Sequence, residues 1–247
     1  MFAIFKKELR SYFLNAIGYV YVGVFLAVSG LLCCYTTLGS KTYDTSTYFS
    51  YIIMTFTVLI PLLTMKLFSE EKKLRTEQLL LTAPVSIWGM VLGKFLAAFT
   101  LFVSSVLVSC VSFFPLASYA NAEKIADAYD APVGPVFSMI ISSTLGIILI
   151  GAAFIAIGMF ISSLTENQLA AAIITVAIIF AMLILNAVNN YIGSSVIRFI
   201  ISWVCFMSRF SYFSAGMLDP SALLYYFSIA GVFLLLTVRV YDKRRWG

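Results

Sequence analysis

The sequence predicts an all-α integral membrane protein with six transmembrane helices. Of its 247 residues, 62% are hydrophobic and only 11% are charged, whereas ordinary globular domains carry roughly 25% charged residues. Spanning a hydrocarbon layer takes roughly 20 helical residues, and strands are disfavoured because an open sheet leaves backbone groups unpaired in lipid. Six nearly uncharged stretches meet this length within a single transmembrane domain, 1–247. They are residues 14–38, 48–66, 90–117, 134–161, 168–188 and 221–240.

The distribution of Lys and Arg orients these spans, since cytoplasmic loops are enriched in basic residues. With both termini in the cytoplasm, most of the basic residues fall on the inner side of the plasma membrane. The net charge of +5 is then explained by topology and anionic lipid headgroups, and no nucleic-acid partner is expected. The basic residues expected inside are Lys6, Lys7, Arg10, Lys66, Lys72, Lys73, Arg75, Lys94, Arg239, Lys243, Arg244 and Arg245.

Residues 1–13 are predicted to form an amphipathic helix that lies flat on the inner membrane surface. Its apolar arc contains Phe2, Phe5, Leu9, Tyr12 and Phe13, and Ile4 falls outside that arc. Two interpretations remain open for its polar face, which includes Glu8 and the basic residues Lys6, Lys7 and Arg10. The helix either anchors the first span alone, or it also contacts a cytoplasmic partner.

Residues 69–82 form a charged island between the second and third spans and are predicted to be a short cytoplasmic coupling helix. Ser69 is the expected N-cap, and a Glu71–Arg75 pair is expected four residues apart along the helix. The island is either a docking site or a solvated loop. Its candidate coupling residues are Ser69, Glu70, Glu71, Lys72, Lys73, Arg75, Thr76, Glu77 and Gln78.

The start of the third span contains Gly89, Gly93 and Lys94 in a spacing that does not match a nucleotide-binding loop. The two glycines are expected to permit close helix packing. Lys94 is expected to extend its ammonium group to water from the inner end of the span.

Residues 189–219 are too apolar for a free loop, and Arg198 and Arg209 divide them into pieces too short to cross the membrane. A seventh span would also place the basic C-terminus outside. We expect a re-entrant helical hairpin that dips into the outer leaflet between spans five and six. The alternative is an amphipathic helix lying on the outer surface.

The island sequence SEEKKLRTEQLLLTAPVS, residues 69–86, resembles the loop of ABC-2 type transporter permeases. In that pattern a pair of acids and basic residues precede Gly-Thr-x-Glu-Leu-Leu and a Pro, and Arg75 stands where many members have Gly. SSLTENQ, residues 162–168 with Glu166, is similar to the family's short inner loop. Residues 209–246 resemble the gliding-motility branch, particularly at Phe213, Gly216 and Asp219.

This resemblance implies the fold of an ABC-2, or type V, exporter and a permease that is not itself an enzyme. The family pairs two membrane subunits, identical or different, with two ABC ATPase subunits, so ATP and Mg are expected on the partner ATPase. No cofactor, metal or catalytic residue is expected on this chain. An accessory extracytoplasmic or membrane subunit is a further possible partner, and the cargo is not identified.

A membrane enzyme is the main competing class, but the chain contains no His, which removes His-based triads and most general-base chemistry at neutral pH. A non-transport scaffold or channel-like subunit is the alternative function. The scarcity of charges within the spans favours an amphipathic or hydrophobic cargo over an ion-coupled one.

Overall fold

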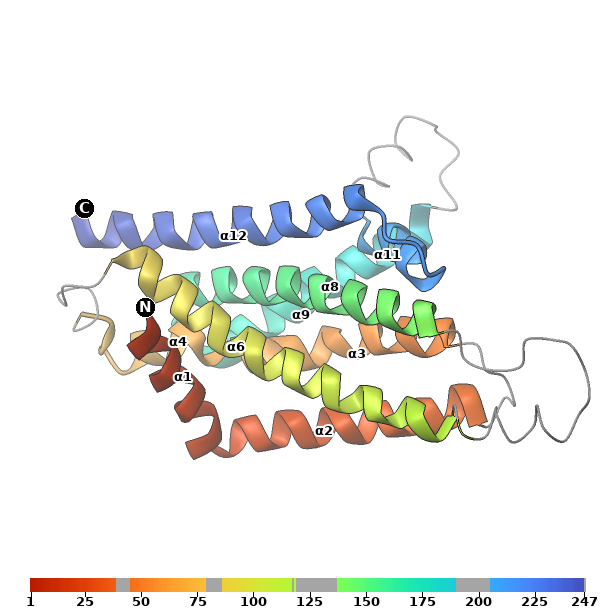
Figure 1. The fold of residues 1–247 in the computed structure, drawn as a ribbon. Coiled ribbons are helices and arrows are strands. Elements are labelled where there is room, and N and C mark those ends of the chain that lie inside the picture. The colour runs from red at the N-terminus through yellow and green to blue at the C-terminus, as the bar shows by residue number, and fades with distance from the viewer. Residues whose placement is uncertain (39–44, 79–85, 117, 119–136, 190–204, 247) are drawn as a thin grey trace, which may run out of the picture.

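The computed structural model describes residues 1–38, 45–78, 86–116, 118, 137–189 and 205–246, and every regular element in these ranges is helical (Figure 1). The elements are α1 (Phe2–Leu14), α2 (Ala16–Cys33), the π-helical turn η1 (Cys34–Leu38), α3 (Ser46–Thr64), α4 (Lys66–Lys73), α6 (Ile87–Ser109), the 3-10 turn η2 (Cys110–Ser112), α8 (Phe137–Leu164), α9 (Gln168–Asn189), α11 (Phe206–Ser214) and α12 (Pro220–Trp246).

Six helical segments in the described ranges are long and apolar enough to cross a membrane, which confirms the predicted fold class. They are Ala16–Thr37, Ser46–Lys73, Ile87–Leu116, Phe137–Leu164, Gln168–Leu185 and Pro220–Arg245.

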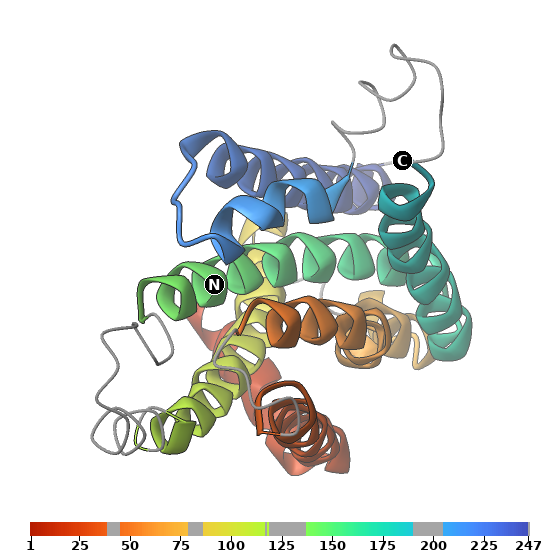
Figure 2. The same ribbon diagram turned by 90° about the vertical axis from the view of Figure 1, so that its right-hand side faces the viewer.

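The centre of the bundle is α8, which packs against α3, α4, α6, α9, α11 and α12. Figure 2 shows it between α12 on one side and α3 on the other. Glycines on α8 permit this close packing: a Cβ at Gly151 would overlap the Phe102 ring of α6, and one at Gly158 would overlap the Thr64 hydroxyl of α3. Small residues at such crossings let helix backbones approach closely.

The N-terminal helix α1 crosses the beginning of α6 and then leads into α2 (Figure 1). A Cβ at Gly93 would lie 3.2 Å from the Met1 carbonyl oxygen and 3.3 Å from the Ile4 Cβ, so this glycine does permit close packing. The buried face of α1 matches the predicted arc only in part. Phe5, Leu9 and Tyr12 of that arc are buried or partly buried. Ile4 and Glu8 are partly buried as well, whereas Phe2 is 76% exposed, because the side of α1 that faces the bundle packs on α6.

Helix α11 runs beside the first half of α8. The Phe206 and Phe154 rings are 5.0 Å apart, and further along the Ser142 hydroxyl donates to the Met217 carbonyl at 3.5 Å. Phe154 and Ser142 are separated by about 18 Å along the α8 axis. Helix α11 corresponds to one limb of the predicted re-entrant hairpin. This limb therefore follows α8 from its middle to its N-terminal end. Residues 190–204, including Arg198, lie outside the described residues.

Candidate functional site

The candidate site is the end of the bundle that carries both chain termini (Figure 1). Here α1, α4 and the beginning of α6 meet the C-terminal ends of α8 and α12. We call this set of elements, together with residues 74–78, the platform. It contains the charged island and the basic residues of α1, so it is the place where the sequence predicts contact with a partner.

Helix α4 follows α3 after a single residue, Met65, whose backbone is itself helical. The predicted N-cap at Ser69 is wrong, because Ser69 lies within α4 and is fully buried. Its hydroxyl donates to the Met65 carbonyl one turn earlier, an alternative that is open to serine within a helix. The second span and the beginning of the island are therefore one nearly continuous helical segment.

The side chain of Ser162, from the end of α8, fills the junction between α3 and α4. Its hydroxyl oxygen accepts from the backbone N–H groups of Phe68 at 3.1 Å and Ser69 at 3.2 Å, and it donates to the Met65 carbonyl at 3.2 Å. One donor and two acceptor positions are all that a hydroxyl offers. Ser162 is thus saturated, and it fixes the beginning of α4 to the central helix.

The predicted helix over 69–82 is interrupted, since α4 ends at Lys73 and residues 74–76 form a turn. The Thr76 N–H bonds to the Glu71 carbonyl, the Arg75 N–H bonds to the Lys72 carbonyl, and Arg75 has a positive φ of 55°. This is the Schellman arrangement, whose left-handed position is usually Gly. Arg75 is therefore not one helical turn beyond Glu71, and the predicted Glu71–Arg75 pair does not form. Glu77 and Gln78 are again helical, and residues 79–82 are not described.

Lys94 is buried at the centre of the platform with 1% of its side chain exposed. Its ammonium group donates to Glu8 Oε1 and Glu71 Oε1, each at 2.9 Å, and to the Leu67 carbonyl at 2.8 Å. The expected extension of Lys94 to water is therefore wrong: carboxylates from α1 and α4 come to the lysine and compensate its charge. This set of four residues is called the Lys94 node.

A second charged cluster joins α4 to α8 and α12. The Ser163 carbonyl near the end of α8 accepts from Lys72 and, at 3.2 Å, from Arg244, and cations are favoured at a helix C-terminus. Arg244 also pairs with Glu77 at 2.8 Å. The rings of Phe68 and Tyr241, on α4 and α12, lie 4.7 Å apart beside this cluster. Both ends of α4 are therefore fixed by neighbouring helices.

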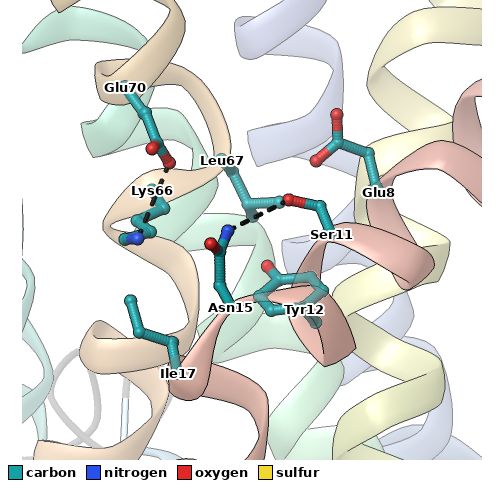
Figure 3. Close-up of a pocket in the computed structure, with 8 residues that line it drawn as sticks. All are labelled: Glu8, Ser11, Tyr12, Asn15, Ile17, Lys66, Leu67 and Glu70. Atoms are coloured by element: carbon teal, nitrogen blue, oxygen red, sulfur yellow. Dashed lines mark hydrogen bonds and ion pairs between the residues drawn. The ribbon is translucent and has the colours of Figure 1, made fainter.

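A small cavity lies where α1 and the α1–α2 turn face the beginning of α4 (Figure 3). Its volume of about 30 Å³ is sufficient for a water molecule or two. Lys66 and Glu70, one turn apart on α4, line one side of it and pair at 3.9 Å. The Tyr12 hydroxyl donates to the Leu63 carbonyl at 3.0 Å, and burial, with a smaller contribution from Glu8, raises the pKa of Tyr12. The cavity is too small to accept a cargo.

The platform buries part of the predicted coupling set and exposes the rest. Ser69 and Lys72 are buried, and Glu71 and Glu77 are held by Lys94 and Arg244. The exposed members lie at the end of α4 and in the residues that follow it, while Glu70 is partly exposed. The exposed predicted residues are Lys73, Arg75, Thr76, Gln78, Lys6, Lys7, Arg10 and, between α8 and α9, Glu166.

Sequence reasoning missed Glu8, Ser162, Ser163 and Arg244 as parts of this site, and it misjudged Lys94. A signal existed for Lys94, because an ion within an apolar span usually marks a functional contact. No comparable signal marked Ser162 or Ser163, since serines in spans most often pack or bond within their own helix.

The predicted residues of the outer hairpin build the connection between α11 and α12. Phe213 is fully buried against Gly146, and Gly216 has a positive φ of 81° just after α11. Asp219 accepts from the Ser221 N–H at 2.9 Å and the Ser221 hydroxyl at 2.6 Å, and these bonds lower the pKa of Asp219. Arg209 donates to Ser221 at 3.3 Å. In the described part of the hairpin these residues define the turn.

A larger, apolar groove of about 470 Å³ lies between α3 and α9. Thr57 contributes a hydroxyl to its lining, and the buried Thr57 Oγ1 atom has no hydrogen-bond partner among the described residues. The lining residues are Met54, Thr57, Val58, Val176, Phe180, Leu183 and Ile184.

A central helix surrounded by apolar spans, with a polar platform at one end, defines a multi-pass helical membrane protein. The chain belongs to the ABC-2 family of transporter proteins, whose family model matches residues 26–246. It is thus a membrane transport component of permease type and not a catalytic subunit. The match identifies the ABC-2 family as a whole, and the gliding-motility branch stays a prediction. A comparison with curated proteins found no match.

Proposed function

We propose that the chain is the permease subunit of an ATP-driven exporter, with the platform facing the cytoplasm and receiving a separate ABC ATPase. ATP and Mg²⁺ are bound by that ATPase, and two permease subunits complete the membrane part. The observation that carries the proposal is the exposed stretch formed by Lys73, the last residue of α4, and the turn of residues 74–76, which extends from a helix fixed to several spans.

Displacement of this turn has a direct route to the membrane helices. Helix α4 continues α3, Ser162 joins it to α8, and Arg244 joins the turn region to α12. Packed elements of this kind transmit movement because their contacts are discrete and not continuously deformable. Closure of the ATPase dimer therefore reorients α3, α8 and α12 together.

The exposed part of the platform is mainly basic, because Glu71 and Glu77 are held internally while Lys73 and Arg75 are exposed. A partner groove with acidic side chains complements this surface and fixes the register of docking.

The groove between α3 and α9 is the best candidate for part of the cargo path. Its volume of about 470 Å³ falls within the range of roughly 300 to 1,000 Å³ that is usual for ligand sites. The apolar lining and the unpartnered Thr57 hydroxyl suit a hydrophobic or amphipathic molecule with a polar group. This agrees with the scarcity of charge in the spans.

Reversing the charges of Lys73 and Arg75 tests the proposal. In K73E/R75E the ATPase should no longer co-purify with the permease, because the substituted carboxylates repel an acidic groove. The free energy of unfolding should change by about 0.5 kcal/mol or less, since both side chains are exposed. Unaltered ATPase binding by a folded K73E/R75E protein would contradict docking at this turn and favour a scaffold role.

Reversing Glu71 does not serve this test. Its carboxylate accepts from the buried Lys94, so E71K would place two ammonium groups together and disturb the fold. Variants of Glu71 instead test the internal connections of the platform.

A further inference from the structure

The Lys94 node joins three segments that are far apart in the sequence. Glu8 belongs to α1, Leu67 and Glu71 belong to α4, and Lys94 belongs to α6. Helix α1 leads into the first span, α4 continues the second, and α6 is the third. One ammonium group therefore connects the platform ends of three successive spans.

The donors of Lys94 are fully used. An ammonium group has three N–H donors, and they are satisfied by two carboxylates and one carbonyl at 2.8 to 2.9 Å. The Phe68 ring lies 5.2 Å from the Nζ atom and closes a further side. The geometry requires α1 and α4 to lie at fixed positions relative to α6.

Neutralising Lys94 takes one carboxylate, yet the site contains two. The exposed Lys7 lies 3.9 Å from Glu8 and 3.7 Å from Glu71, and it offsets the second negative charge. Buried ion clusters contribute little net stability compared with apolar residues of the same shape. A gain in stability therefore does not explain why the site contains two carboxylates. A connection between α1 and α4 needs both, because Glu8 belongs to α1 and Glu71 belongs to α4.

We propose that Lys94 is a positioning residue that makes α1 and α4 move together, so that displacement of α4 by the ATPase also displaces α1 and the first span. This inference rests on the proposed function. Without the node, α4 would still move α3 and α8, but α1 would follow less, through links such as the hydrogen bond from Tyr12 to the Leu63 carbonyl.

Single amide substitutions separate the two connections. E8Q weakens the link to α1 and E71Q weakens the link to α4, while Lys94 keeps one carboxylate in each variant. With the permease and its ATPase in nanodiscs and Mg-ATP as the probe, both variants should keep wild-type melting temperatures and ATPase binding. The permease-dependent ATP turnover should fall at least fivefold in each. D219N, which removes a carboxylate just before the beginning of α12, at the end of the bundle opposite the platform, is the control and should retain wild-type turnover.

Spin labels at Arg10 and Glu166, in a protein without its native cysteines, report the movement of α1 relative to the end of α8. Addition of a non-hydrolysable ATP analogue should change this distance in the otherwise unaltered protein, and the change should be lost in E8Q and E71Q. The inference is overturned if both variants keep the wild-type turnover and distance change.

The neutral triple variant E8Q/E71Q/K94M separates charge from packing. It should melt close to the wild-type temperature and higher than K94M, in which two carboxylates lie together without the buried cation and share the exposed Lys7. Loss of coupling in the stable triple variant supports the inference, and wild-type coupling overturns it. A different result, failure of the ATPase to bind the unaltered permease, would instead refute the proposed function.

Discussion

At the scale of single residues, Arg75 explains a feature of the family pattern. The position where many ABC-2 permeases have Gly is the left-handed residue that ends α4, with a φ of 55°. Glycine adopts this conformation without steric cost, whereas other L-residues are strained there by about 1 to 2 kcal/mol. The family's glycine is therefore explained by the backbone of this turn.

Replacing Arg75 tests this account. Arg75→Gly should raise the free energy of unfolding by about 0.5 kcal/mol, after allowance for the greater freedom of glycine in the unfolded chain. Arg75→Val should lower it by about 1 kcal/mol or more, because a β-branched residue is particularly strained at positive φ. Thermal unfolding in detergent measures both. Lys73→Gly is the control and should destabilise the protein by about 1 kcal/mol, since Lys73 lies within regular helix. A stabilising Arg75→Val would contradict the explanation.

At the scale of elements, the α3–α4 junction depends on a side chain from another helix. The Phe68 and Ser69 N–H groups both donate to Ser162. Helix α4 thus begins with its backbone bonded to α8, and it cannot leave α8 without exposing these two donors.

Two neighbouring serines give a matched test of this junction. Ser162→Ala leaves two buried N–H groups without an acceptor and should lower the free energy of unfolding by about 1 to 3 kcal/mol. Ser163→Ala should have a smaller effect, of about 1 kcal/mol or less, because the Ser163 hydroxyl donates to the Phe160 carbonyl of its own helix and its loss leaves no backbone N–H of α4 unpaired. Thermal unfolding compares the two variants. Equal effects would show that α4 does not depend on the Ser162 hydroxyl.

The sequence was sufficient to predict elements and insufficient to predict their junctions. The length of the apolar stretches and the distribution of charge predicted the helical class and the six spans. These two features can be read from each stretch of sequence by itself, because a helix must be long and apolar enough to cross the lipid. The end of α4 was misplaced, since a left-handed arginine has no local signature. Lys94 was misjudged for a related reason: its carboxylates come from residues 8 and 71, and no pattern within one segment indicates that they meet.

At the scale of the whole molecule, the spans are unequally covered. Helix α8 is surrounded, whereas α2 exposes Tyr19, Val20 and Leu31, and α9 exposes Leu169 and Ile173. Lipid or a second permease subunit covers such apolar faces. We expect the second subunit along the first two spans and the fifth, where Gly23 and Gly30 of α2 would allow close approach.

Gly23 and Gly30 provide a test of this dimer interface that leaves the single subunit intact. A Cβ at either position would meet no atom within 4 Å in the monomer, so Gly23→Leu/Gly30→Leu should unfold at the wild-type temperature. If another subunit packs on these glycines, the added side chains should weaken the dimer roughly tenfold or more, or about 1.4 kcal/mol. Energy transfer between labelled permeases in vesicles, measured on dilution with lipid, reports the association. Gly231→Leu is the control, because Gly231 is equally open but lies on α12, outside the expected interface. Dissociation caused by Gly231→Leu alone would indicate that the interface lies at α12. Unchanged energy transfer in both variants would indicate that Gly23 and Gly30 face lipid.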